Sequence, residues 1–286
     1  MNRRVLRIGA AEPRSPESGV VLAGLALLGI EAELETVEPT NVTLAGAVRS
    51  VRTAATIGAL VGPAWQERAA AAADRLAEDG RAVGAVDILT GEGTRAVGHQ
   101  RTGAAFRHAL DVLVGRQKMP KAALVLGSSG AARAIVHACI TSGFQSVVVF
   151  DRHLHKAEAL VRHFAKSAAH MDLRARPWHE TVLGSELART RVLVNATAPD
   201  PDPDASPLPA ALLTDGLFVL DLDAGSPEPR LVRDARGAGA AAAAGGGELL
   251  LHRVGAALEL WSGRRPDPVA LAERLGELRA GAGAGA

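Results

Sequence analysis

A glycine-rich run, GSSGAAR, directly follows a short apolar segment and could hold a phosphate group. The apolar segment is Ala122–Leu126, and the run opens a helix-compatible stretch that ends near Phe144. A strand, a tight glycine turn and a helix in that order present backbone N–H groups and the positive end of the helix dipole to a phosphate. Gly127 can take the dihedral angles of the turn, and Gly130 keeps the turn small. The predicted dinucleotide-binding residues of the turn are Gly127, Ser128, Ser129, Gly130 and Ala131.

Ser129 departs from the dinucleotide fingerprint, which has a glycine at this position. Its Cβ would crowd a diphosphate, whereas its hydroxyl could donate a hydrogen bond to the same group. The sequence leaves both alternatives open.

The choice of nucleotide depends on the next predicted strand, which ends at Asp151 and Arg152. An acid at this tip bonds the ribose 2′-hydroxyl of NAD, whereas an arginine suits the 2′-phosphate of NADP. Arg133 and Lys156 add two positive charges nearby. Three cations outweigh one acid in a phosphate pocket, so we expect a nicotinamide dinucleotide as partner, with NADP preferred slightly over NAD.

The elements that must position these residues alternate between strand and helix. This alternation is typical of an α/β fold with a parallel sheet and helices on both faces. Apolar runs predict strands at 122–126, 146–150, 191–194 and 217–222, and helical patterns occur at 131–142 and 156–164. Residues 199–209 are rich in Pro and Asp, which predicts a loop. Residues 237–247 are nearly all Ala and Gly, which predicts a flexible connection.

The rest of the chain predicts a second α/β region. A turn rich in glycine, Thr90-Gly91-Glu92-Gly93, separates two apolar segments and indicates a hairpin of residues 83–89 and 95–99. Further strands are expected at 5–9, 32–37 and 57–61. A loop rich in Pro and Ser is expected at 12–18, after the strand at 5–9. Helices are expected at 20–28, 44–52, 66–78, 104–114, 249–261 and 269–278.

Composition excludes several classes of protein. The net charge of +1 lacks the excess of a nucleic-acid binder, and the chain has no tyrosine for base stacking. The single cysteine, Cys139, excludes an internal disulfide and is typical of a small buried hydrophobe. The histidines lack metal-ligand spacing, so we expect no metal. The sequence has no recognisable leader and no apolar run long enough to span a membrane, so we expect a cytoplasmic protein with no membrane or nucleic-acid partner. Its composition is compatible with a homodimer.

Five stretches follow one another in an order that resembles the shikimate dehydrogenase family over nearly the whole chain. They are VGAVD (83–87), GSSGAAR (127–133), FDRHLHKAEAL (150–160), VNATAP (194–199) and GGELLLHRVGAALELWSGRRP (246–266). The resemblance implies a substrate-type domain of residues 1–103 and 249–279 and a Rossmann-type domain of residues 104–248, with a disordered tail at 280–286. It also implies that Asn195, Ala196 and Thr197 lie near the nicotinamide.

The resemblance ends at the positions that carry the family's chemistry. The family's catalytic lysine corresponds to Trp65, or to Gln66 if the register shifts by one, and its catalytic aspartate corresponds to Thr102. The substrate-binding positions and their neighbours hold Ser15, Glu17, Asp87, Arg101 and Arg253. Losing hydrogen-bond partners for a polyol forfeits orders of magnitude in discrimination, so we expect a substrate other than shikimate.

Two functions remain open at the level of sequence. The first is an NAD(P)-dependent oxidoreductase acting on a CH–OH or C=O group of an unidentified small molecule, with His99 and His252 as candidate proton donors. In that case Arg101 or Arg253 could hold a carboxylate. The alternative is a catalytically silent member that binds a nucleotide or has a regulatory or structural role.

Overall fold

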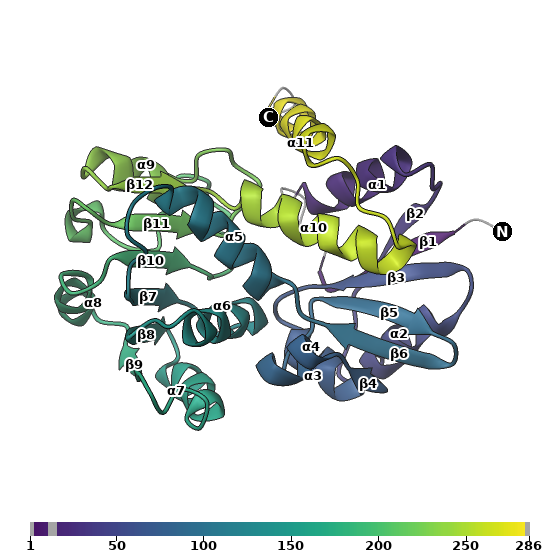
Figure 1. Cartoon of the computed structure of the whole chain (residues 1–286), viewed down its shortest axis with the longest axis horizontal. Helices are drawn as coiled ribbons and strands as arrows, with labels where there is room; N and C mark the ends of the chain where they lie inside the picture. The colour runs from purple at the N-terminus through teal and green to yellow at the C-terminus, as the bar shows by residue number, and fades with distance from the viewer. Residues whose placement is uncertain (1–2, 11–15, 284–286) are drawn as a thin grey trace. The chain divides into compact units, whose positions relative to one another are not determined.

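The computed structural model describes residues 3–10 and 16–283. It has an α/β fold that divides into two compact units (Figure 1). The first unit contains the chain up to Ala105 and again from Leu249, and the second contains Phe106–Glu248. Two helices, α5 (Thr102–Val114) and α10 (Gly247–Ser262), each contain a boundary between the units.

The second unit is built on a six-stranded sheet in the order β12-β11-β10-β7-β8-β9. Every neighbouring pair in it is parallel. The order is that of the doubly wound dinucleotide-binding fold, and it reverses between β7 and β10, where ligands bind at the carboxyl ends of the strands. The strands are β7 (Ala122–Leu126), β8 (Ser146–Asp151), β9 (Asp172–Pro177), β10 (Val192–Asn195), β11 (Phe218–Asp221) and β12 (Ala242–Ala244).

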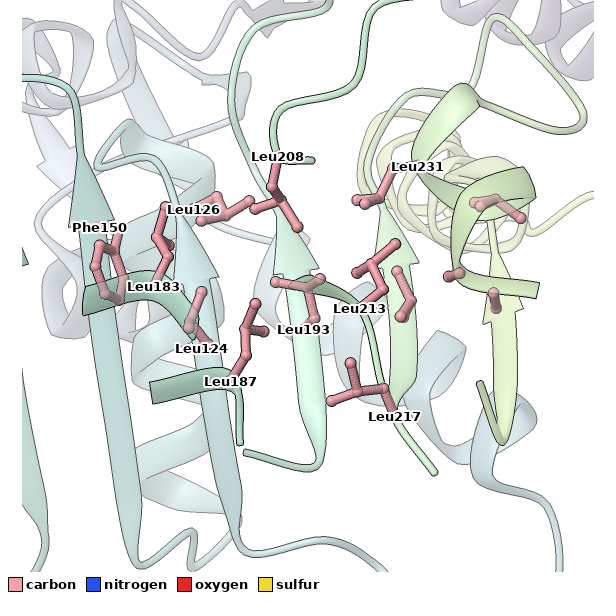
Figure 2. Packing of buried hydrophobic residues seen from close by; sticks show 14 of the residues in the cluster. Leu124, Leu126, Phe150, Leu183, Leu187, Leu193, Leu208, Leu213, Leu217 and Leu231 are labelled. Carbon is pink, nitrogen blue, oxygen red and sulfur yellow. The ribbon is translucent and has the colours of Figure 1, made fainter. Parts of the chain in front are cut away.

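The core of the second unit lies between this sheet and its helices. Figure 2 shows leucines of the strands, such as Leu124 and Leu193, in one cluster with Leu183 and Leu187 of α8. The central strands β7 and β10 are apolar except for Asn195 at the end of β10, because both faces of a parallel sheet are covered. The helical segments are α6 (Gly130–Thr141), α7 (Leu154–Phe164), α8 (Glu180–Leu187), η2 (Ala210–Leu212) and α9 (Arg230–Gly237).

Cys139 lies on α6 with no exposed surface, as predicted for a small buried hydrophobe. Burial raises the pKa of its thiol to about 12. The thiol is therefore protonated at neutral pH and unreactive.

The first unit contains a mixed six-stranded sheet in the order β2-β1-β3-β5-β6-β4. The predicted hairpin is confirmed, with β5 and β6 antiparallel and Gly93 in the turn at a φ of +60°. The strands are β1 (Arg4–Ile8), β2 (Glu33–Val37), β3 (Thr56–Val61), β4 (Arg75–Leu76), β5 (Ile88–Glu92) and β6 (Arg95–His99).

Helix α10 packs on this sheet through Trp261. Its indole Nε1 donates to the Leu89 carbonyl over 3.0 Å. A Cβ at Gly58 would lie 2.0 Å from the same nitrogen, so the ring can lie there only because β3 carries a glycine. The other helical segments of the unit are α1 (Glu17–Leu27), α2 (Leu44–Arg49), η1 (Ser50–Arg52), α3 (Gln66–Ala72), α4 (Glu78–Val83) and α11 (Pro268–Gly283).

The single helix predicted at 66–78 is wrong. Helix α3 ends at Ala72, because the next residues pair with β6 instead of continuing the helix. The Asp74 amide donates to the Ala96 carbonyl, and the Asp74 carboxylate accepts from the Ala96 amide. The strand predicted at 83–89 likewise begins only at Ile88, since Gly84 ends α4 at a φ of +71°.

The flexible connection predicted at 237–247 is also wrong. Residues Ala242–Ala244 form β12, which pairs with β11 and buries Ala243 at the end of the sheet. The predicted tail differs as well, because α11 continues to Gly283. None of the described helices is long and apolar enough to cross a membrane.

Candidate functional site

The glycine turn of the second unit lies between the ends of two neighbouring strands. Gly127 follows β7 with a φ of +99°, a backbone conformation that residues other than glycine rarely adopt. Its amide donates to the Phe150 carbonyl over 2.7 Å, and a Cβ on it would lie 2.7 Å from the Ala196 carbonyl oxygen. Only glycine lets the turn pass this closely beside β10.

Ser129 forms the N-cap of α6 but makes no side-chain capping hydrogen bond. Its Oγ is buried and has no hydrogen-bond partner among the described residues. The first N–H groups of a helix have no partner within the helix and favour an anion. The turn therefore has the open amides and the spare hydroxyl that suit the diphosphate of a dinucleotide.

The tip of β8 carries the predicted determinants of nucleotide choice. Asp151 accepts hydrogen bonds on both carboxylate oxygens, from Ser128 Oγ at 2.5 Å and from the His153 amide at 2.8 Å. Arg152 and Lys156 are exposed beside it. Arg133, in contrast, is buried within α6 and is 8% exposed.

The loop after β10 is held by its own side chains. Asn195 Oδ1 accepts from Thr197 Oγ1 over 2.6 Å and from the Thr197 amide over 3.2 Å. Asn195 Nδ2 donates to Asp221 Oδ2 over 3.0 Å and so links the ends of β10 and β11. Burial raises the pKa of Asp221 to about 6. Sequence reasoning missed Asp221, although an acid at the end of a buried strand is a signal for it.

The first unit brings two predicted substrate-binding residues together in a buried ion cluster. Glu17 begins α1, and its Oε1 is bound by the Arg253 guanidinium of α10. Its Oε2 accepts from Arg7 Nη1 of β1 over 3.3 Å. Arg7 and Glu17 are 3% and 7% exposed. Arg7 was missed in the sequence, where it is one polar residue within an apolar strand.

A second cluster surrounds Asp87, which has no exposed surface. Its Oδ2 accepts from Thr102 Oγ1 over 2.6 Å and from the Thr102 amide over 2.7 Å. Its Oδ1 accepts from the Arg101 amide over 2.9 Å, so the carboxylate caps the start of α5. Burial raises the pKa of Asp87, which the positive charge of Arg253 and the Thr102 hydrogen bond oppose only in part.

The remaining predicted residues of this unit have separate surroundings. His99 Nε2 lies 2.9 Å from Thr90 Oγ1, and burial lowers the pKa of the His99 ring. The Arg101 guanidinium pairs with Asp79 over 3.3 Å. His252 lies on α10, next to Arg253. Ser15 lies outside the described residues.

The two residues that the resemblance matches to the family's lysine, Trp65 and Gln66, carry no ammonium group. Trp65 packs against the core of the first unit, and the Arg68 guanidinium lies 5.2 Å from the centre of its ring. Gln66 begins α3 and is 1% exposed. Its Nε2 donates to the Val61 carbonyl over 3.0 Å.

Comparison with known proteins places the chain among dehydrogenases. No protein-family model matches it. The chain is 33% identical to the shikimate dehydrogenase (NADP(+)) of Streptomyces avermitilis, in an alignment that covers 72% of this chain and 69% of that protein. It is 32% identical to the same enzyme of Brucella abortus strain S19, with coverage of 84% and 82%.

The structure leads to the same family. It is similar to shikimate 5-dehydrogenase from Thermus thermophilus in complex with NADP(H) and shikimate, with a TM-score of 0.81 and 29% identity. That similarity covers 96% of this chain and 99% of the other. With two compact α/β units, one of them a doubly wound dinucleotide-binding fold, the chain belongs to the shikimate dehydrogenase family of NAD(P)-binding oxidoreductases.

Proposed function

We propose that this chain is an NADP-dependent oxidoreductase that interconverts an alcohol and a carbonyl in a small molecule other than shikimate. The observation that carries the proposal is the rebuilt polar interior of the first unit. By the resemblance, Thr102 corresponds to the family's catalytic aspartate, and its hydroxyl donates a hydrogen bond to Asp87. Glu17 and Arg253 bind each other. A site for shikimate, a ring acid with several hydroxyl groups, needs side chains at these positions that are available to bind those hydroxyls.

The second unit supports nucleotide binding. Gly127 and the N-terminus of α6 would hold the diphosphate, with Ser129 Oγ as a further donor. When bound, the nucleotide supplies or accepts a hydride. The curated relatives described above are named as NADP(+) enzymes.

The tip of β8 supports NADP over NAD. Both Asp151 oxygens already accept hydrogen bonds from within the protein. Asp151 keeps its negative charge, but the exposed Arg152 and Lys156 outnumber it and would attract a 2′-phosphate. Because Arg133 is buried in α6, the preference rests on two cations rather than three.

His99 is the better placed of the two proposed proton-transfer residues. The Thr90 hydroxyl fixes the orientation of its ring through Nε2, and Nδ1 has no partner within the described part of the chain. Because burial lowers its pKa, the ring is neutral at pH 7. His99 would then accept a proton from a substrate hydroxyl as the alcohol is oxidised, and return it in the reverse direction.

A catalytically silent, nucleotide-binding protein is the second candidate. It is favoured by the use of Asp87 as a helix cap, because a carboxylate that already accepts three hydrogen bonds is poorly available to a substrate. In that case the nucleotide would bind, and no alcohol or carbonyl compound would be turned over.

Titration of the full chain with NADPH and with NADH, followed by tryptophan fluorescence, tests the proposal. We expect saturable binding of both, tighter for NADPH by up to about tenfold, which corresponds to about 1.4 kcal/mol. An Arg152→Ala variant should lose this preference, whereas the exposed Arg116, which is outside the proposed site, provides the matched control R116A. Absence of binding by either nucleotide would overturn the oxidoreductase proposal.

A further inference from the structure

A buried carboxylate held by two guanidinium groups has the chemistry of a bound anionic ligand. In the first unit that carboxylate belongs to the protein. Arg7 of β1 and Arg253 of α10 each bind one oxygen of Glu17. The side chains of Arg7 and Glu17 are 3% and 9% exposed, and that of Arg253 is 16% exposed.

An external anion would have to compete with Glu17 for these guanidinium groups. Displacing Glu17 would leave its carboxylate buried without its charge partners, which is strongly unfavourable. Asp87 adds a second obstacle, because it is buried within the electrostatic influence of Arg253. An anion approaching Arg253 therefore meets two acids.

Two uncharged side chains of the first unit are buried with hydrogen-bonding capacity to spare. Gln66 and Gln100 are 1% and 4% exposed. Gln66 Oε1 and Gln100 Nε2 have no hydrogen-bond partner in the described parts of the chain. The backbone around Asp87 joins them, because the Gln66 carbonyl accepts from the Val86 amide and the Asp87 amide donates to the His99 carbonyl. A free amide acceptor and a free amide donor suit hydroxyl and carbonyl groups.

We propose that Glu17 determines substrate specificity by occupying Arg7 and Arg253, and that the substrate of this oxidoreductase is an uncharged polyol or hydroxyketone without a carboxylate or phosphate. The inference rests on the proposed function and narrows it. Glu17 acts as a tethered anion, which a substrate carboxylate would otherwise replace.

Chemical rescue with acetate tests whether Glu17 occupies an anion site formed by Arg7 and Arg253. Glu17→Ala removes the carboxylate and leaves a space beside two guanidinium groups. Acetate should raise the melting temperature of E17A and bind it saturably, whereas acetamide, its neutral isostere, and chloride at equal ionic strength should not. The wild type should show no saturable response to acetate. The control is E35A, because Glu35 pairs with Arg4 on the surface, where the side chains are 49% and 38% exposed.

If E17A folds only in the presence of acetate, that dependence itself supports the inference. The isosteric E17Q variant provides a second measurement, because it removes the negative charge beside the guanidinium groups with little change in volume. The inference is overturned if the wild type binds acetate as tightly as E17A, or if neither variant responds to acetate.

Turnover measurements test whether the substrate is an uncharged polyol or hydroxyketone. With NADPH, the wild type should reduce uncharged ketoses such as fructose in preference to keto acids such as pyruvate, and E17Q should shift the ratio of kcat/KM toward keto acids by about tenfold or more. A wild type that prefers keto acids contradicts the inference. If no nucleotide binds, the proposed function fails, but the acetate experiment still decides the role of Glu17.

Discussion

At the scale of single residues, Asp87 and Thr102 form the centre of the buried polar cluster in the first unit. Asp87 carries a carboxylate and Thr102 a hydroxyl, and the two are joined by a hydrogen bond of 2.6 Å. His99 is linked to Asp87 through the backbone, because the His99 carbonyl accepts a hydrogen bond from the Asp87 amide. These contacts are the reason why we propose His99, whose pKa burial lowers, as the base near the capped start of α5.

His99→Gln should lower kcat/KM for alcohol oxidation by about 10²–10⁴-fold, the usual contribution of a positioned acid–base residue. Burial lowers the pKa of His99, so the wild-type rate should be constant at neutral pH and fall only when acidification protonates the ring. H99Q should lack this fall. The exposed His170 gives the control H170Q, and an unchanged pH profile in H99Q would contradict the assignment.

At the scale of elements, the site depends on how closely the ends of parallel strands approach. Gly127 after β7 passes beside Ala196 after β10, and Asn195 links β10 to Asp221 at the end of β11. The loops that would meet a nucleotide are thus fixed by close backbone packing at Gly127 and by the hydrogen bond between the Asn195 and Asp221 side chains.

Gly127→Ala should weaken NADPH binding by about tenfold or more and cost about 1–3 kcal/mol of stability, because the Cβ meets backbone and φ is +99°. Fluorescence titration and urea denaturation measure the two effects. Gly46→Ala on the exposed face of α2 is the control, because no described atom lies within 4 Å of its Cβ. That variant should be up to about 1 kcal/mol more stable. Normal nucleotide binding by G127A would refute this role of the turn.

Asp221 makes the linked strand ends sensitive to pH. Its pKa is raised from 3.8 to about 6 on folding, so the folded state binds the proton more tightly than the unfolded state. Stability contributed by the protonated form is therefore present below pH 4 and lost as pH rises through about 6, by up to about 3 kcal/mol. Denaturation of Asp221→Asn across this range should lack that loss. Parallel pH profiles of the two proteins would contradict the prediction.

At the scale of the whole molecule, local patterns determine what could be predicted. The apolar runs and the glycine turn predicted the parallel sheet of the second unit, because each signal lies within a few residues. Strand β9 was missed because its arginines find their partner elsewhere, with Arg174 and Arg176 bound to Glu186 of α8. Strand β12 was missed because only pairing with β11 makes an Ala-Gly segment regular.

The candidate site follows the same rule. Glu17 and Arg253 were identified as charged replacements, but their pairing joins residues 236 positions apart. Arg7 could be found only once the strands were in place, whereas Asp221 ends a strand that the sequence predicts. The fold could be predicted from local patterns, whereas the contacts on which the proposed chemistry rests are long-range.

We expect this member of the family to bind NADP(H) without oxidising shikimate. The most direct measurement is the rate of NADP⁺ reduction by the purified full chain with saturating shikimate, in protein already shown to bind NADPH. The account predicts no rate above that without substrate. Turnover of shikimate at about 1 s⁻¹ or more, the lower end of ordinary kcat values, would contradict it.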